Sequence, residues 1–595
     1  MPPLQSSPQL NRVSQFYGGI TMDKRDTSPG VHLNMEEVDI FAEKNSVRPT
    51  TIFSADETIT RRVTGYTLDK DDNLFAIGRN AAGTPKAQVW KKTTASVATP
   101  GAWASFITSA QNSNAQSPIE WHEYKIDISS ITVASTTATV AILASAINPS
   151  GTHGLAAGDT VTIEGAITAG LNGTFTIDTV PATTSFTYTV ASRTTESISD
   201  AQVRVGYLYY VTATRTLVRL GPTPSVATEY TTDLTGVNMT LPALGNYNDR
   251  IPMLRDFGSL YIGNGQYISE IDNNGIFSPQ SFQLPDGWEV VSMATAGENM
   301  AVLARSVNTG MNHSMIFYWD LTSAEQPLDR IRLSMGGPQI VFNWHEAIWA
   351  ICAQNGNLIA YVVSDRQAIP KLFLDNISEE TDTQAIIPDA TKFTFEDCIY
   401  FALWKTDKTG IYAIGSLGYG FSPALIMAKR FAPSTVSDYD NHIPYAVFAA
   451  GPNMYASYSD NGTPTLRRLE ANNSPTYSSD AVIETVYINA QSPEMLKTWP
   501  GIVVISHPMG ASCSITVSGR TDDASSYKAS TEKELTPEDD QLADGATADT
   551  YWVREWVSLR GRSLQSKIKF KSNGSTSRPT LLEIAPISVE ESLYG

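Results

Sequence analysis

The segment from residue 126 to residue 205 constrains the fold most, because it interrupts a strand pair that reads on without it. If residues 119–125 were joined directly to residues 206–220, they would read as two alternating aromatic and aliphatic strands with a turn between them. The segment carries short period-2 strands of its own, at 131–133, 160–163, 174–177 and 185–190. Because the termini of small domains often lie close together, such a module can sit in a hairpin without disturbing its host. We therefore predict an inserted small β-domain at 126–205 in an all-β host.

The charge of the chain limits what it can bind. Charged residues make up 17% of the 595 residues, below the quarter that is usual in soluble domains. The formal net charge of -19 makes the average surface repel nucleic acid and anionic lipid. We expect no sequence-specific nucleic-acid binding.

Targeting and redox signals are equally plain. The first residues lack a basic stretch followed by an apolar core, and no apolar run approaches the roughly twenty residues of a membrane helix. These features predict a soluble protein made in a cytoplasm, without a transmembrane segment. Cys352, Cys398 and Cys513 lie far apart in apolar surroundings, which favours buried free thiols over a disulfide or a metal site.

A loose repeat runs through the middle of the chain. Seven units, each an alternating strand, a turn rich in Asp, Asn and Gly, and a second alternating strand, begin near residues 65, 119, 256, 291, 347, 398 and 445. A small sheet that is apolar on both faces cannot stand alone, and radial stacking buries both faces. We predict a β-propeller-like body at 56–125 and 206–478, in preference to a tandem of sandwiches. The copies are divergent and carry no WD or kelch signature, so the number of blades stays open.

The two ends of the chain differ from this body. Residues 1–55 are predicted to form an extended N-terminal arm, which we expect to dock on a neighbouring subunit because it has few core positions. After residue 478 the strands become longer, at 482–488, 501–505, 513–517, 551–557 and 566–570, which predicts a C-terminal β-sandwich at 479–595. The acidic stretch 532–549 within it is interpreted as a solvated loop rather than a cation site.

The search for catalytic groups finds no constellation. The seven histidines show no ligand spacing: they are His32, His122, His153, His313, His345, His442 and His507. Only His345, between Trp344 and Glu346, is weighed as an acid-base group, while a local cap is favoured for His153. Two adjacent pairs near the termini, 36–37 and 590–591, are poor candidates for the separated carboxyl groups of a glycosidase.

Motif searches lead to the same result. Residues 457–462 resemble a sialidase-type turn but lack its spacing and its tryptophan, and residues 71–73 and 272–275 are ordinary hairpin turns. A Gly-x-Ser-x-Gly elbow and a Walker loop are absent from the sequence. Clustered aromatic residues at 207–210 and 344–349 are interpreted as core filling, with a glycan platform as the alternative. We predict a chain that is not an enzyme, with no catalytic, cofactor-binding or metal-binding residues and no cofactor.

Two stretches carry a resemblance to a known family. The pattern His153-Gly-Leu-x-x-Gly-Asp-x-Val-x-Ile163, followed by 171–177 and 186–188, resembles a small β-module that is common in structural proteins of tailed bacteriophages. The lead-in Gly18-Gly-Ile-x-x-Asp-x-Arg25, followed by 38–41, is similar to the opening of phage tail proteins predicted to be propellers. In outline, an arm, a propeller-like body and a terminal sandwich are similar to the tail hub or nozzle proteins of short-tailed phages.

This resemblance implies a virion subunit in the phage tail, made in the host cytoplasm. Its expected partners are other tail proteins and further copies of itself, in a ring around the tail axis along the DNA exit path. The alternative is a receptor-binding tail protein that recognises a glycan or protein of the host surface. A propeller that hydrolyses glycans is a third possibility, and no catalytic residues accompany the resemblance.

Overall fold

A computed structural model of the chain describes residues 8–590 apart from a set of internal segments. The residues left out are 1–7, 17–18, 21–30, 42–44, 58–61, 80–86, 95–100, 107–114, 116, 144–152, 154, 199–200, 213–216, 221–250, 308–312, 355–356, 375–392, 396, 405–408, 417–422, 432–441, 452, 461–462, 471–476, 491–493, 523, 525, 529–531, 537–550, 575–576 and 591–595.

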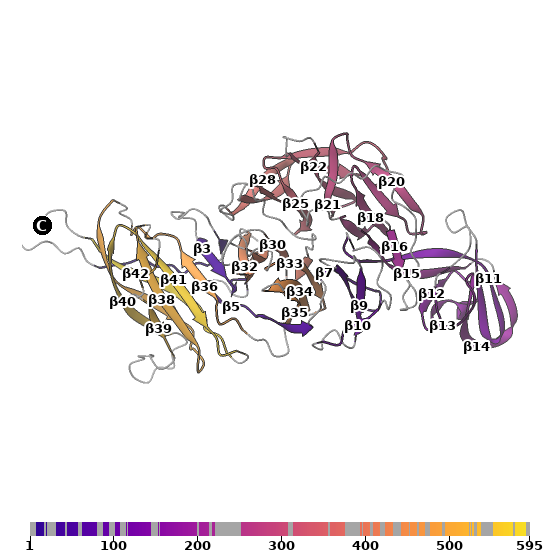
Figure 1. Cartoon of the computed structure of the whole chain (residues 1–595), viewed down its shortest axis with the longest axis horizontal. Helices are drawn as coiled ribbons and strands as arrows, with labels where there is room; N and C mark the ends of the chain where they lie inside the picture. The colour runs from indigo at the N-terminus through magenta and orange to yellow at the C-terminus, as the bar shows by residue number, and fades with distance from the viewer. Residues whose placement is uncertain are drawn as a thin grey trace, which may run out of the picture.

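Seven antiparallel sheets stand around a common centre and form a propeller-like ring (Figure 1). Each of the seven repeat units of the sequence lies in a different sheet, and we number these sheets as blades 1 to 7 in chain order. Blade 1 contains β7 (Arg62–Leu68), β8 (Leu74–Arg79), β9 (Gln88–Lys92) and β10 (Ala104–Ser105). Blade 2 contains the first part of β11 (Glu120–Ile142) with β15 (Gln202–Val211) and β16 (Leu217–Leu220). Blade 3 contains β17 (Met253–Asp256), β18 (Ser259–Asn264), β19 (Tyr267–Ile271) and β20 (Phe277–Gln283).

The remaining blades follow in the same order around the ring. Blades 4 and 5 contain β21 (Trp288–Ala296), β22 (Asn299–Ser306), β23 (Ser314–Trp319) and β24 (Asp329–Leu333), then β25 (Pro338–Trp344), β26 (Ala347–Gln354), β27 (Asn357–Ser364) and β28 (Gln367–Leu374). Blades 6 and 7 contain β29 (Phe393–Phe395), β30 (Cys398–Leu403), β31 (Gly410–Gly415) and β32 (Ala424–Arg430), then β33 (Pro444–Ala450), β34 (Asn453–Asp460), β35 (Thr463–Glu470) and β6 (Phe53–Glu57).

Apolar strands and Asx turns explain why these residues form blades. Every residue of β18 and of β31 is buried, because each blade packs against a neighbour on both faces. Between β7 and β8 the side chain of Asp69 accepts hydrogen bonds from the backbone nitrogens of Asp71 (2.9 Å) and Asn73 (2.8 Å). Asp272 caps the turn between β19 and β20 in the same way. The hairpin turns predicted at both places are confirmed.

The ring is closed by a strand from the start of the chain. β6 pairs antiparallel with β35 and so becomes the outer strand of blade 7, although more than 400 positions separate Phe53 from its partner Leu469. Apolar clusters fill the spaces between neighbouring blades all around the ring. The cluster at the closing seam joins blade 7 to blade 1 through Tyr455, Tyr66 and Val63. Both faces of each blade are therefore buried, as the repeat predicts.

The inserted module grows out of blade 2 without a break in the backbone. β11 pairs with β15 from Glu120 to Asp127 and then with β14 (Ser185–Ile198) from Ile131 onward. β12 (Thr160–Glu164), the short 3₁₀ helix η1 (Ala169–Leu171) and β13 (Gly173–Ala182) complete the module, which projects from the ring (Figure 1). Val140, Leu171 and Tyr188 are buried inside it. The direct pairing of β11 with β15 confirms the interrupted hairpin.

Two sheets form the C-terminal sandwich at the opposite end of the molecule from the insert (Figure 1). One sheet contains β1 (Gln9–Leu10), β42 (Leu581–Glu590), β37 (Lys497–Ser506) and β40 (Tyr551–Gly561). The other continues blade 6 through β3 (Val31–Glu36), β36 (Val482–Thr485), β41 (Leu564–Lys571), β38 (Ser514–Thr521) and β39 (Lys533–Leu535), with β2 (Gly19–Ile20) beside β3. Trp499, Ile515 and Ile568 are buried in the apolar cluster that includes both sheets.

The described parts of the N-terminal segment pack within the chain. β1 and β3 join the C-terminal sheets, and Met35, Val38 and Val47 are fully buried. Docking of this segment on a neighbouring subunit stays a prediction. A small two-stranded sheet of β4 (Val38–Asp39) and β5 (Arg48–Pro49) follows β3. The four-part division at residues 55, 125, 205 and 478 stays a proposal, and β6, β11 and β15 run across three of these boundaries.

Candidate functional site

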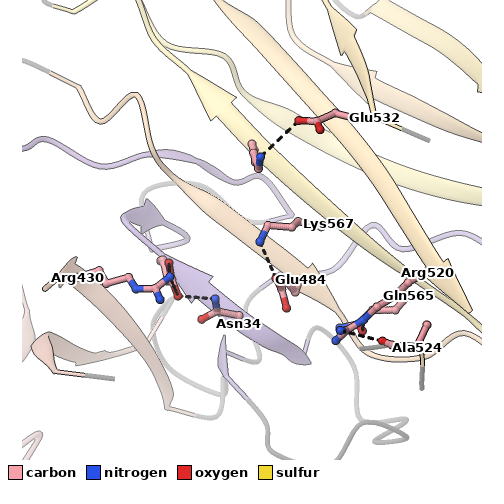
Figure 2. Close-up of polar contacts among 10 residues, drawn as sticks. Asn34, Arg430, Glu484, Arg520, Ala524, Glu532, Gln565 and Lys567 are labelled. Carbon is pink, nitrogen blue, oxygen red and sulfur yellow. Dashed lines mark hydrogen bonds and ion pairs between the residues drawn. The ribbon is translucent and has the colours of Figure 1, made fainter. Parts of the chain in front are cut away.

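The junction between ring and sandwich is built by β3, which lies between β32 of blade 6 and β36 of the C-terminal sheet. β3 runs parallel to β32 and antiparallel to β36. Glu36, at the end of β3, accepts two hydrogen bonds from the Arg430 guanidinium at 3.0 and 2.8 Å and one from the Asn34 amide at 2.6 Å (Figure 2). A carboxylate on the N-terminal strand thereby binds the last residue of a ring strand.

Glu37 continues this junction one residue later. Its side chain is 7% exposed, pairs with Lys429 Nζ at 2.8 Å and accepts a hydrogen bond from the Ser478 hydroxyl. Its backbone nitrogen donates to the Met427 carbonyl at 2.8 Å. Buried carboxylates of this kind persist only when their charges are paired and hydrogen-bonded. The adjacent acids 36 and 37, set aside by sequence as catalytic candidates, therefore join ring strand β32 to the segment that leads into the sandwich.

Paired charges extend across the outer face of the same sheet. Lys567 on β41 pairs with Glu484 on β36 at 3.0 Å, and Lys569 pairs with Glu532 at 3.4 Å (Figure 2). On β38, Arg520 donates to the Gln565 side chain at 2.6 Å. Such cross-strand pairs each contribute only about 0.2–1 kcal/mol. They link neighbouring strands of the sheet across this face.

The centre of the ring holds the carboxyl group with the most perturbed titration. The first strands of neighbouring blades contact one another around this centre. Glu120, at the start of β11, is half-buried there and accepts a hydrogen bond from the Thr67 hydroxyl of blade 1 at 3.5 Å. Desolvation raises the pKa of Glu120 to about 8, against the opposing effects of Arg255 and Thr67. A carboxylic acid that keeps its proton near neutral pH can act as a general acid.

Polar contacts link the inner strands from blade to blade. Arg255 of blade 3 donates to the Trp121 carbonyl of blade 2 at 3.1 Å. Asp256 accepts the Thr295 hydroxyl of blade 4. The Asn343 amide of blade 5 donates to the Thr295 carbonyl at 3.1 Å. Glu120 therefore lies in a belt of inter-blade hydrogen bonds, which sequence reasoning missed because no local motif marks it.

His345 was the one histidine weighed for acid-base chemistry. It sits in the two-residue turn between β25 and β26, where φ is 50° for His345 and 62° for Glu346. Its Nε2 lies 3.0 Å from Asp397 Oδ1 of blade 6, and both side chains are exposed, at 46% and 71%. The Trp344 indole donates to the Asp397 carbonyl at 3.0 Å. This turn therefore connects blades 5 and 6 at the surface.

The buried histidines have structural positions. Burial lowers the pKa of His32 and of His122 to about 4, which keeps both rings neutral near pH 7. The backbone nitrogen of Leu155 donates to His153 Nδ1 at 3.0 Å, so the local cap predicted for His153 is confirmed. Cys352, Cys398 and Cys513 are buried, and none of them forms a disulfide. Tyr207, Tyr209 and Tyr210 are buried as well, as the core interpretation predicts.

A groove opens where the insert leaves the ring, and we call it the neck groove. It has a volume of about 520 Å³. Its lining comes from β11, from the end of β12 and from the start of β15: Lys125, Asp127, Ile128, Leu143, Glu164, Gly165, Ala201 and Gln202. Sequence reasoning missed this groove, because its residues come from four separate stretches of the chain.

Some candidate positions lie outside the described residues. Most of the acidic stretch 532–549 belongs to them, as do Gly18, residues 21–25 of the lead-in, residues 461–462 and Glu591. Within the described part of the chain, no group of three or more His, Cys, Asp and Glu residues could hold a metal ion. No helix in that part is long and apolar enough to cross a membrane.

Comparisons with known proteins give only structural neighbours. No family model and no curated protein matches the chain. An exo-beta-1,3-galactanase from Phanerochaete chrysosporium with galactose is 9% identical over 56% of this chain and 95% of its own, with a TM-score of 0.26. The phage phi92 endosialidase is 11% identical over 78% of this chain and 69% of its own, with a TM-score of 0.24. A chain of a mitotic checkpoint complex is 10% identical over 70% of this chain and 91% of its own, with a TM-score of 0.31.

These neighbours correct the prediction about enzymatic activity, and their low similarity limits what can be concluded about this chain. A galactanase and an endosialidase are enzymes, so the prediction that this chain is not an enzyme is contradicted and is withdrawn. At identities of 9 to 11% and TM-scores below 0.5, the likeness supports no particular activity. One of these neighbours is a phage protein.

Proposed function

We propose that this chain is a structural component of a bacteriophage virion tail, placed as a hub, nozzle or tail-tip adaptor. Its partners are other tail proteins and further copies of the chain, arranged in a ring around the tail axis along the DNA exit path. The net charge of -19 suits that path, because like charge keeps DNA from adhering. The phage-like sequence patterns at 18–25 and 153–188 support this proposal.

The continuous sheet from blade 6 into the C-terminal sandwich is the observation that carries the proposal. β32, β3 and β36 are hydrogen-bonded neighbours, so ring and sandwich are joined by a sheet rather than by a flexible linker. A linker would allow the two parts to move independently. A shared sheet holds them in one orientation, which is what a subunit needs when it contacts different neighbours at its two ends.

Location on the virion tests this proposal directly. A small tag inserted between residues 545 and 546, in the sequence between β39 and β40, would be labelled with gold particles and imaged on intact virions. We expect label at the tail, in a ring of symmetric positions. Absence of the chain from purified virions, or label on the capsid alone, would refute the proposal.

Recognition of the host surface is the second candidate function. The insert lies at the opposite end of the molecule from the C-terminal sandwich, so a subunit anchored by its sandwich would present the insert outward (Figure 1). Purified chain should then bind host cells and block infection, and the same chain without residues 128–201 should do neither. Equal blocking by both proteins would exclude the insert from host recognition.

A further inference from the structure

The neck groove is built on the polar face of three neighbouring strands. Asp127 of β11 is paired with Gln202 of β15, which is paired in turn with Glu164 of β12. One step along the strands, Lys125 is paired with Arg204 in the same way. Because side chains alternate across a strand, these five residues share one face, while Ile126, Val203 and Ile163 between them are buried on the other.

The polar groups of the neck are fixed and electrically balanced. Glu164 is bound by Lys125 Nζ at 3.0 Å and by Arg204 Nη2 at 3.3 Å. The hydrogen bond from Lys125 holds the pKa of Glu164 below its usual range. The Gln202 amide donates to Asp127 Oδ1 at 2.9 Å. Two cations and two carboxylates leave no net charge, so the groove offers little to a strongly ionic ligand.

Apolar surface lies beside these polar groups. Leu143 is 44% exposed at the wall of the groove and supplies the exposed apolar surface there, while the neighbouring lining residues Ile128 and Ala201 are buried. The Leu143 backbone nitrogen donates to the Asp127 carbonyl at 2.9 Å, which holds this side chain beside the carboxylate. A volume of about 520 Å³ lies within the range of small-molecule sites.

We infer that the neck groove binds a short neutral oligosaccharide. Sugar hydroxyl groups can donate to the carboxylates of Asp127 and Glu164 and accept from the Gln202 amide. The C–H faces of the sugar rings would pack on Leu143. Side chains already held by neighbours lose little conformational entropy on binding. The inference deepens the second candidate function and rests on it for its biological purpose, while the geometry stands without it.

The first experiment screens the full chain on an array of neutral and sialylated oligosaccharides of two to four units. Isothermal titration then measures the affinity for the best neutral glycan. We expect saturable binding, weakened at least tenfold in the double variant Asp127→Ala/Gln202→Ala. A second variant, Leu143→Asp, adds a charge beside the sugar face without removing a polar partner, and should weaken binding as well. The control, Asp178→Ala, removes an exposed carboxylate elsewhere on the insert and should bind as the wild type does.

Each result decides the inference. Binding only of sialylated glycans, no binding of any neutral glycan at millimolar concentrations, or equal binding by folded double variant and wild type would overturn it. Melting curves and far-UV circular dichroism establish that each variant is folded. If the chain binds no glycan and yet blocks infection, glycan binding at the neck groove is refuted and host recognition is not. If the chain binds glycan at the neck groove and does not block infection, glycan binding stands and host recognition is refuted.

Discussion

At the scale of single residues, a fully buried ion pair secures the closing seam of the ring. Asp56 on β6 and Lys92 on β9 have no exposed side-chain surface, and their charged atoms lie 2.7 Å apart. Asp56 also accepts from the Gly101 backbone nitrogen at 2.9 Å and the Trp103 indole at 2.6 Å. Lys92 Nζ lies 5.3 Å from the ring centres of Trp103 and Tyr455. The closing strand is thus tied to blade 1 as well as to blade 7.

Removing one partner of this pair should be costly. Lys92→Met leaves a buried, uncompensated carboxylate, and we expect a loss of about 3–5 kcal/mol in the free energy of unfolding. The double variant Asp56→Leu/Lys92→Met should recover most of that loss, because no charge remains buried. Urea unfolding followed by tryptophan fluorescence measures both. Lys91→Met, one residue away, should cost less than about 1 kcal/mol. A double variant as unstable as the single one would refute the charge explanation.

The buried histidine His32 predicts a loss of stability in acid. Its folded-state pKa of about 4 lies below the usual 6.5, so the unfolded chain binds a proton between these values and the folded chain does not. Stability therefore falls as pH drops from 6.5 to 4. His32→Gln keeps a donor for the Gln15 carbonyl, which lies 3.2 Å from Nε2, and should reduce the dependence of unfolding free energy on pH in this window. Equal slopes for variant and wild type would contradict this.

The protonated side chain of Glu120 predicts a loss of stability as pH rises. Its folded-state pKa of about 8 lies above the usual 4.5, so the folded chain holds the extra proton between these values. The stability that this proton contributes is lost as pH rises toward 8. Glu120→Gln cannot ionise, so its stability relative to the wild type should grow between pH 5 and pH 9. Urea unfolding at several pH values measures this, and a constant difference would refute the raised pKa.

Individual residues show where sequence reasoning succeeds and where it stops. Local patterns sufficed for the turns capped by Asp69 and Asp272 and for the cap at His153, because the interacting atoms are close in sequence. The structural role of Glu36 and Glu37 could not be read from the sequence, because their partners Arg430 and Lys429 lie almost 400 positions away. Burial raises the pKa of Glu120, while Thr67 of blade 1 and Arg255 of blade 3 oppose that rise, and all of these groups come from different blades. The roles of such groups can be recognised only once the fold brings their distant partners together.

At the scale of elements, the N-terminal strands do two jobs that their sequence does not reveal. β6 closes the ring and β3 joins ring to sandwich, so both depend on strands from the far end of the chain. The periodic repeat and the long C-terminal strands predicted the blades and the sandwich, because alternation is a local property. The same alternation is weak before residue 55, where short strands are completed by distant partners. The sequence therefore predicts a neighbouring subunit for residues 1–55 and does not reveal the strands within the chain that pair with β1, β3 and β6.

Deleting residues 1–57 should therefore open the ring and separate the sandwich. The truncated chain loses the outer strand of blade 7 and the strand between β32 and β36, which exposes unpaired strand edges. We expect aggregation, or two separate unfolding transitions in place of one, in differential scanning calorimetry. Deleting only residues 1–10 removes the exposed pair Gln9–Leu10 and should change the melting profile little. A single transition in the longer deletion would contradict the coupling role.

At the scale of the whole molecule, the chain is a ring with one attachment at each end. The sandwich shares a sheet with blade 6 through β3, and the insert shares a six-stranded sheet with blade 2 through the two-stranded ribbon of β11 and β15 (Figure 1). The difference matters, because the sheet contains strands from three parts of the chain while the ribbon is a local hairpin. The sandwich is therefore expected to be required for ring stability, and the insert is not.

Removal of the insert tests this asymmetry. Replacing residues 128–201 by Asn-Gly joins β11 to β15 through a type I′ turn and keeps their pairing from Glu120 to Asp127. The Tyr207 hydroxyl loses the His153 carbonyl, and part of the apolar cluster around Tyr124 becomes exposed, so a loss of a few kcal/mol is expected. The shortened chain should nevertheless be monodisperse, rich in β-structure and cooperative in urea unfolding. If it failed to fold while the isolated insert folded alone, the ring would depend on the insert, and the view of a tolerant host with an added module would be wrong.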